Sequence, residues 1–221
     1  MRFDRSKVLL LVAVFAFAVS AAAGTIYSQP YDGSGKLYAS QNDIGGLGNF
    51  ATAYDDFTLT GNPGGWQVTD IHWTGGYFNP GGPGNITNFT LDFYNNSSGI
   101  PGSLIQSFTT GNNANESCSG NICTYSAVLA GGGLTLQNGV NYWLSIEPDM
   151  AFPPQWGWAT SGVGNDGGYQ CFSGTCGGLG VNFAFDLTGN PASTTPEPGT
   201  LVLLGTGLLG ALGVMRRKMN L

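Results

Sequence analysis

The sequence predicts an all-β fold: a jelly-roll-like β-sandwich flanked by an N-terminal signal helix and a C-terminal apolar helix. Three observations lead to this prediction. Short segments within residues 24–190 alternate apolar with polar side chains, which is typical of half-buried strands. Turns rich in Gly, Pro and Asn separate these segments at spacings seen in sandwiches. Good helix formers are scarce between the two ends of the chain.

The alternation is clearest in 89–94, where Phe89, Leu91 and Phe93 face one side, and in 140–146, where Trp143 lies opposite the apolar face. Segment 66–73 has two mixed faces, and Tyr54-Asp55-Asp56 is expected to be turn material. The order of strands in the sheets is not predicted. The expected strands, in chain order, are 57–59, 66–73, 89–94, 104–108, 124–129, 134–136, 140–146, 156–159 and 183–187. The expected turns include 98–102 and the glycine run 131–133.

All four cysteines lie in the body, as two Cys-x4-Cys pairs. Three pairings are possible. The equal spacing favours two local disulfides, Cys118–Cys123 and Cys171–Cys176, and an exported chain meets an oxidising compartment. Loops this small stabilise a fold by only about 2 kcal/mol each. A zinc site built from the four thiolates is the alternative, because the spacing also falls within the zinc range.

The charge of the body differs from that of the ends. Between residues 24 and 195 only Lys36 is basic, against eleven Asp and Glu residues, so this part carries a net charge of −10. Binding to nucleic acid or to anionic lipid draws on Lys and Arg, which argues against both partners. A solvated acidic surface is the simplest interpretation, and uptake of cations is the alternative.

The N-terminus has the pattern of a secretory signal peptide over residues 1–23. Arg2, Arg5 and Lys7 precede the apolar run 8–19, and an Ala-x-Ala site favours cleavage before Gly24. The alternative is an uncleaved anchor, although the apolar run is short for a membrane span.

The C-terminus has three parts: a linker with prolines over 191–200, an apolar helix over 201–215 and a basic tip over 216–221. A helix over 201–215 would be about 22 Å long, short of the roughly 30 Å hydrocarbon core. Bilayer thinning and snorkelling allow it to span. The positive-inside rule places the tip in the cytoplasm and the body outside it. The alternative is a buried C-terminal helix, which would normally have a polar face.

Pro196, Glu197 and Pro198, followed by the apolar segment and the basic residues Arg216, Arg217 and Lys218, resemble the PEP-CTERM sorting signal of Gram-negative bacteria. The resemblance covers about residues 194–221. It implies recognition by an exosortase, a membrane protease-transpeptidase, after transient residence in the inner membrane. It also implies a destination in the cell envelope, at the cell surface or in the extracellular matrix. Similar tails carry a label that refers to ice-binding proteins, from which we infer no ice binding.

Candidate chemistry in the body is sparse. His72 is the only histidine, so a Ser-His-Asp triad would have to use it, and no G-x-S-x-G elbow is present. Glu147 with Asp149, and Asp55 with Asp56, are the carboxylate pairs that glycoside hydrolysis would require.

We expect no cofactor; structural calcium is the alternative, with Asp55, Asp56 and Asp186 as candidate ligands. Trp156 and Trp158 share one face of an expected strand and are the candidates for stacking on sugars. N-x-[ST] sequons occur in a chain rich in Asn and Thr, where chance accounts for them.

The sequence therefore predicts an exported, non-enzymatic envelope or matrix protein that is sorted through its tail. A carbohydrate-binding module of the exopolysaccharide matrix is the first alternative. A secreted hydrolase that uses Asp or Glu is the second.

Overall fold

The computed structural model describes residues 23–192 and 205–207. The predicted signal peptide (apart from Ala23), the Pro-Glu-Pro motif, the basic tip and most of the apolar segment lie outside the described residues. Residues 205–207 of that segment are helical. No helix in the described part of the chain is long and apolar enough to cross a membrane.

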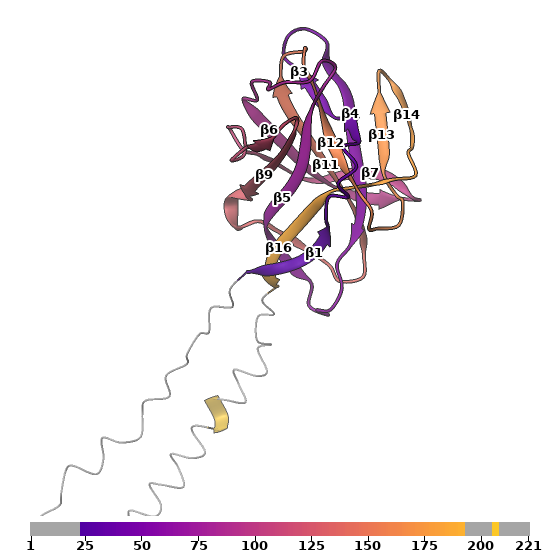
Figure 1. Cartoon of the computed structure of the whole chain (residues 1–221). Helices are drawn as coiled ribbons and strands as arrows, with labels where there is room; N and C mark the ends of the chain where they lie inside the picture. The colour runs from indigo at the N-terminus through magenta and orange to yellow at the C-terminus, as the bar shows by residue number, and fades with distance from the viewer. Residues whose placement is uncertain (1–22, 193–204, 208–221) are drawn as a thin grey trace, which may run out of the picture.

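The body consists of two β-sheets with very little helix, as predicted (Figure 1). The first sheet has nine strands. Its main path runs β1 (Gly24–Gln29), β16 (Phe185–Pro191), β5 (Trp66–Phe78), β12 (Gln155–Ser161) and β15 (Asn182–Phe183). Off this path, β9 (Ile122–Val128) and β10 (Leu134–Leu136) pair with β5, β2 (Leu37–Ala39) pairs with β12, and β8 (Ser117–Ser119) pairs with β9. A short 3-10 turn, Ala130–Gly132, precedes β10.

The second sheet has seven strands. Their order is β14 (Thr175–Gly178), β13 (Tyr169–Phe172), β4 (Gly48–Thr58), β3 (Gln41–Asp43), β11 (Asn141–Met150), β6 (Asn88–Ser97) and β7 (Ile100–Thr109). β4 also pairs with β11. All the pairings are antiparallel except that of β3 with β11.

The two sheets pack face to face through a core rich in aromatic residues. Phe57 of β4 contacts Phe185 of β16, with ring centroids 6.0 Å apart. Phe89 of β6 contacts Trp73 of β5 at 5.0 Å and Trp156 of β12 at 5.5 Å. Apolar side chains at every second position supply these contacts, so alternation in the strands produces the core. The arrangement is sandwich-like, and jelly-roll connectivity stays a prediction.

The predicted alternation of β11 is confirmed: Tyr142, Leu144 and Ile146 join the core, whereas Trp143 points to the other face. The turn predicted over residues 98–102 is too long. Ser98 and Gly99 alone make the turn, both with positive φ, and β7 begins at Ile100. Two consecutive residues with positive φ match the right-handed twist of a hairpin, which lets the strands pair up to the turn.

The prediction of a turn at Tyr54-Asp55-Asp56 is wrong, because these residues lie within the longest strand of the second sheet. Asp is depleted in strands because its carboxylate competes for backbone donors. Here each carboxylate accepts a hydrogen bond from another segment: Phe183 N donates to Asp55 Oδ2 at 2.6 Å, and Asn141 Nδ2 donates to Asp56 Oδ2 at 2.9 Å. These tertiary contacts override the local preference.

Both predicted disulfides are confirmed, Cys118–Cys123 between β8 and β9 and Cys171–Cys176 between β13 and β14. Each closes a hairpin, and the two cysteines of each pair are directly opposite in the ladder. Because all four sulfur atoms are bonded in pairs, the zinc alternative is wrong.

The ends of the body lie together. β1 pairs with β16, so the chain enters and leaves the fold at neighbouring positions, at the lower end in Figure 1. Pro191 is opposite Trp66, the first residue of β5. From there β5 extends to Phe78, roughly 40 Å away at about 3.3 Å per residue. The tail is therefore attached at one end of the body, and β3 lies at the other (Figure 1).

Candidate functional site

His72 does not form a catalytic triad. It is exposed on β5, opposite Asp186 of β16 and Ser126 of β9. Although the three side chains share one face, no hydrogen bond joins them within residues 23–192. Nucleophilic catalysis requires a nucleophile that is hydrogen-bonded to its base, and Ser126, His72 and Asp186 do not provide this pair.

The prediction that Trp156 and Trp158 stack on sugars is wrong, because both side chains are completely buried. Trp158 stacks on Phe183 at 4.9 Å, and its Nε1 donates to the carbonyl of Ala184 at 3.0 Å. Trp156 Nε1 donates to the Tyr125 hydroxyl at 3.0 Å. The two indoles belong to the core between the sheets.

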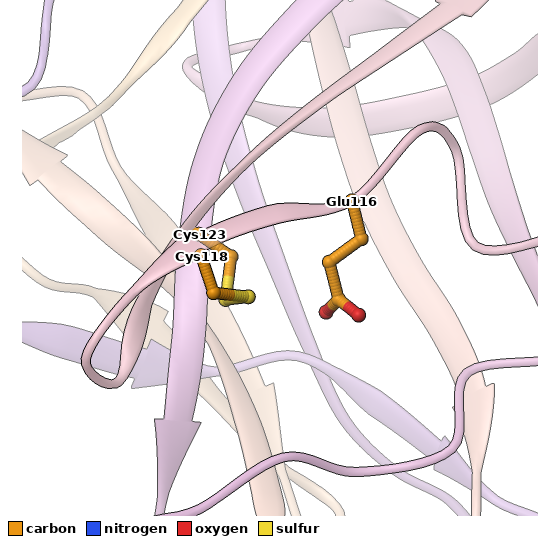
Figure 2. A group of neighbouring side chains, drawn as sticks. All are labelled: Glu116, Cys118 and Cys123. Carbon is orange, nitrogen blue, oxygen red and sulfur yellow. A yellow bond between two sulfur atoms is a disulfide. The ribbon is translucent and has the colours of Figure 1, made fainter.

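Glu116, Cys118 and Cys123 bring possible metal ligands within 4.8 Å of one another (Figure 2). The two sulfur atoms are joined as a disulfide, so they are not thiolates and cannot bind a metal. The Glu116 carboxylate accepts hydrogen bonds from the Tyr77 and Tyr125 hydroxyls instead. This cluster is structural.

The strongest candidate site is a polar cavity of about 140 Å³ on the outer face of the second sheet. Its floor consists of side chains that point away from the core on three neighbouring strands, β4, β11 and β6. We call it the acidic pocket. It is lined by Asn42, Asn49, Thr52, Tyr54, Thr90, Asp92, Tyr94, Ser145, Glu147 and Asp149.

Three carboxylates meet in the acidic pocket, and each has a different environment. Asp149 accepts hydrogen bonds from Asn42 and Asn88, at 2.7 and 3.0 Å, so both of its oxygens are satisfied. Asp92 accepts one bond from the Tyr94 hydroxyl at 3.0 Å, and its Oδ1 is buried with no partner among the described residues. A buried acceptor without a partner is unusual and requires an explanation such as a donor from outside the described residues.

Glu147 is the third carboxylate, and it is 9 % exposed. Burial raises its pKa to about 7, with the charge of Asp92 acting in the same direction and a 2.7 Å hydrogen bond from Thr52 acting against it. Near neutral pH this group therefore exists in both forms, one that accepts hydrogen bonds and one that also donates.

Aromatic side chains border the acidic pocket. Tyr54 contacts Tyr94 at 5.6 Å and Tyr169 at 6.3 Å, and Tyr169 contacts Trp143 at 6.2 Å. Burial raises the pKa of both Tyr54 and Tyr94, so their hydroxyl groups stay protonated. The rim thus combines ring surfaces with hydroxyl donors.

A second, larger hollow of about 530 Å³ adjoins the acidic pocket, because Asn49 lines both. Its wall is aromatic: Phe172 is 44 % exposed and packs edge-on against Phe50 at 5.8 Å, and Phe152 is 38 % exposed. We call it the aromatic hollow. It also contains Asn79, which follows β5, so it lies at the end of the body opposite the tail.

Sequence reasoning found only part of this surface. Glu147 and Asp149 were recognised as a carboxylate pair, but Asp92 and the tyrosines were not connected to them. The alternation of 89–94 does place Thr90, Asp92 and Tyr94 on one face. The signal that was missing is the pairing of β6 with β11, which sets Ser145 opposite Asp92. Asp186, a predicted calcium ligand, lies on β16 in the first sheet, whereas Asp55 and Asp56 lie on β4 in the second.

A two-sheet body with two disulfides and an acidic surface is typical of an exported domain. A family model for the PEP-CTERM protein-sorting motif matches residues 194–218. The chain therefore carries this sorting tail, which implies an exported protein that is directed to the cell envelope and sorted by an exosortase. No curated protein matches the chain.

Proposed function

We propose that this protein is a non-enzymatic component of the cell envelope or extracellular matrix, and that its body binds polysaccharide through the acidic pocket. The observation that carries the proposal is the convergence of Asp92, Glu147 and Asp149 with tyrosine rings in one open cavity. Carboxylates accept hydrogen bonds from sugar hydroxyl groups, and aromatic faces cover the apolar faces of sugar rings.

The sizes of the two cavities favour a polymer. Sites for complete small ligands usually measure about 300–1,000 Å³, and the acidic pocket, at about 140 Å³, is smaller. The acidic pocket therefore suits one sugar residue of a polysaccharide. The adjoining aromatic hollow provides about 530 Å³ and exposed rings for further residues. An extended glycan crossing Asn49 would contact both.

The negative charge of the acidic pocket limits which glycans can bind there. Lys36 is the only Lys or Arg between residues 24 and 195, and it does not line either cavity. Carboxylated or sulfated sugars would face three carboxylates without a compensating cation. The expected ligand is therefore a neutral polysaccharide or one that carries amino groups.

One observation supports hydrolysis as a second candidate. Glu147, with its pKa raised to about 7, and Asp92 lie in the same cavity, as the acid and the base of a glycosidase would. We rank binding first because the acidic pocket is small.

A glycan array with the mature exported protein tests the proposal, followed by titration calorimetry on the best ligand. Asp92→Asn and Glu147→Gln each remove a charged acceptor, so we expect each to weaken binding by about 10-fold or more. Asp70→Asn, on the outer face of β5, is the matched control and should bind like the wild type. The proposal would be refuted if no matrix polysaccharide bound, or if both pocket variants kept the affinity of the wild type. Release of reducing ends by the wild type would favour hydrolysis.

The sorting step is tested separately. Deletion of residues 196–221, followed by cell fractionation, should change the location of the protein, and the mature mass of the full-length protein should show processing. An unchanged location together with an intact C-terminus would contradict sorting through the tail.

A further inference from the structure

Asp56 is a buried carboxylate on the outer face of β4, outside the acidic pocket. The residue is 6 % exposed. Its Oδ2 accepts hydrogen bonds from Asn141 Nδ2 at 2.9 Å and from Asn165 Nδ2 at 2.8 Å. Its Oδ1 is buried and has no partner among the described residues. A carboxylate oxygen removed from water without a partner is costly, which indicates that something else satisfies it.

The two asparagines that donate to Asp56 Oδ2 each carry a side-chain oxygen as well. Asn141 uses its amide nitrogen on Asp56, and its own Oδ1 is also buried without a partner in the described part of the chain. Asn165 approaches the same carboxylate from the loop 162–168, and its Oδ1 accepts a bond from Gly167 N at 3.1 Å. Two amide groups therefore flank one carboxylate, and each has an oxygen with unused lone pairs.

Gly167 lets this loop close over the carboxylate. A Cβ added there would overlap Asp56 Oδ1 and lie 2.8 Å from Asn165 Oδ1. The two oxygens are thus on the same side of Gly167 and near each other. Any other residue would fill the space that they share.

No basic side chain neutralises Asp56. Lys36, the one Lys or Arg in residues 23–192, lies beside Asp32. The next carboxylate, Asp55, faces the core and binds Gln29 and Phe183 of the first sheet. It therefore supplies no positive charge to Asp56.

We propose that Asp56, Asn141 and Asn165 form a calcium-binding site that fastens the loop 162–168 to the second sheet. Carboxylate and amide oxygens are the ligands of a hard divalent cation, and Ca²⁺ accepts the irregular arrangement that a loop provides better than Mg²⁺ does. Water completes the coordination, since Asn165 is exposed. The site uses only one of the three predicted carboxylates as a ligand, and it excludes Asp186.

The test measures the melting temperature of the mature protein in EDTA, in Ca²⁺ and in Mg²⁺. A single Ca²⁺ site at about ten times its dissociation constant should raise the melting temperature by roughly 3–6 °C for a domain of this size. Asp56→Asn should abolish the shift. The variant should still fold, because the new amide nitrogen is a donor where Asp56 Oδ1 has no partner, while its carbonyl accepts the two existing bonds. Gly167→Ala should also abolish the shift.

Two controls keep the effect specific. Gly177→Ala adds a Cβ where nothing lies within 4 Å, and Asp186→Asn removes a carboxylate from the other sheet. Both should retain the full Ca²⁺ shift. Absence of a shift in the wild type, an equal shift in Asp56→Asn, or loss of the shift in Asp186→Asn would each overturn the proposal.

Terbium luminescence gives an independent measurement that does not depend on the variants folding. Tb³⁺ replaces Ca²⁺ at oxygen sites, and Trp143 is paired with Asp56 across β4 and β11, so its indole can sensitise the bound ion. We expect sensitised emission from the wild type that Ca²⁺ displaces. If the wild type gives no such emission, or if Ca²⁺ does not reduce it, the site does not exist.

Discussion

The buried carboxyl group of Asp55 should make the body less stable as pH rises from 5 to 8. Asp55 has no exposed surface and lies between the two sheets. Burial raises its pKa from 3.8 to about 8; hydrogen bonds from Phe183 and Gln29 act against this increase, and the charge of Asp56 adds to it. Between these two pH values the folded state binds a proton that the unfolded state has released. Stability is therefore greatest at low pH and is lost as pH rises through the folded pKa.

The size of the effect is bounded by one proton. A single group changes the free energy of unfolding by at most about 1.4 kcal/mol per pH unit, so Asp55 contributes at most about 3 kcal/mol between pH 5 and 7. Glu147, whose pKa is raised to about 7, also lowers the stability of the folded state as pH rises from 5 to 7. Urea unfolding followed by tryptophan fluorescence, with EDTA present to remove cations, measures the slope.

Asp55→Asn removes the proton and keeps an acceptor for Phe183 N. The variant loses the acceptor for Asp56 N, which Asp55 Oδ1 provides at 3.1 Å, so it should be less stable than the wild type at pH 5 by about 1 kcal/mol. With rising pH the difference should shrink and then reverse. Asp70→Asn serves as the control for loss of one half-exposed carboxylate and should keep the wild-type slope. A wild-type stability that is flat or increases from pH 5 to 7, or an Asp55→Asn slope equal to it, would refute the reasoning.

Three further predictions concern stability and can be checked by the same urea titrations at fixed pH. Trp158→Ala should cost about 3–5 kcal/mol, because the indole is fully buried and stacks on a core ring; a loss below 1 kcal/mol would mean that the core does not pack as described. Gly75→Ala should cost about 1–3 kcal/mol, since its Cβ would overlap the Trp156 indole, whereas Gly177→Ala should be neutral. Replacing both cysteines of the Cys118–Cys123 disulfide by serine should cost only about 2 kcal/mol, because the loop is short; complete unfolding would contradict a purely local role.

Features that depend on neighbours in sequence were predicted well. The disulfides follow from spacing alone, because each joins residues separated by five positions. The strands β6 and β11 follow from alternation, since one face of each is apolar and joins the core, whereas the other carries mainly polar side chains.

Features that depend on distant segments were not predicted. Alternation in 156–159 shows that Trp156 and Trp158 share a face, but it does not show whether that face meets water or the other sheet. Every residue of β12 is in fact buried, and the strand pairs with β5, β2 and β15. The acidic residues of β4 were similarly misplaced, since their donors come from segments more than 80 positions away.

The positions of the two proposed sites explain why a sorted protein would have this body. The tail leaves from β16, beside the first residue of β5, whereas the aromatic hollow lies past the last residue of β5, roughly 40 Å away at about 3.3 Å per residue. A glycan held in that hollow and in the acidic pocket does not compete with a protease working on the tail.

The proposed calcium site lies on the same outer face as the acidic pocket, and Tyr169 of β13 directly follows the loop 162–168. Because Tyr169 also contacts Tyr54 and Trp143 at the pocket rim, fastening the loop would hold that rim in place. Cation binding outside the cytoplasm would then favour glycan binding, with no contact between ion and sugar.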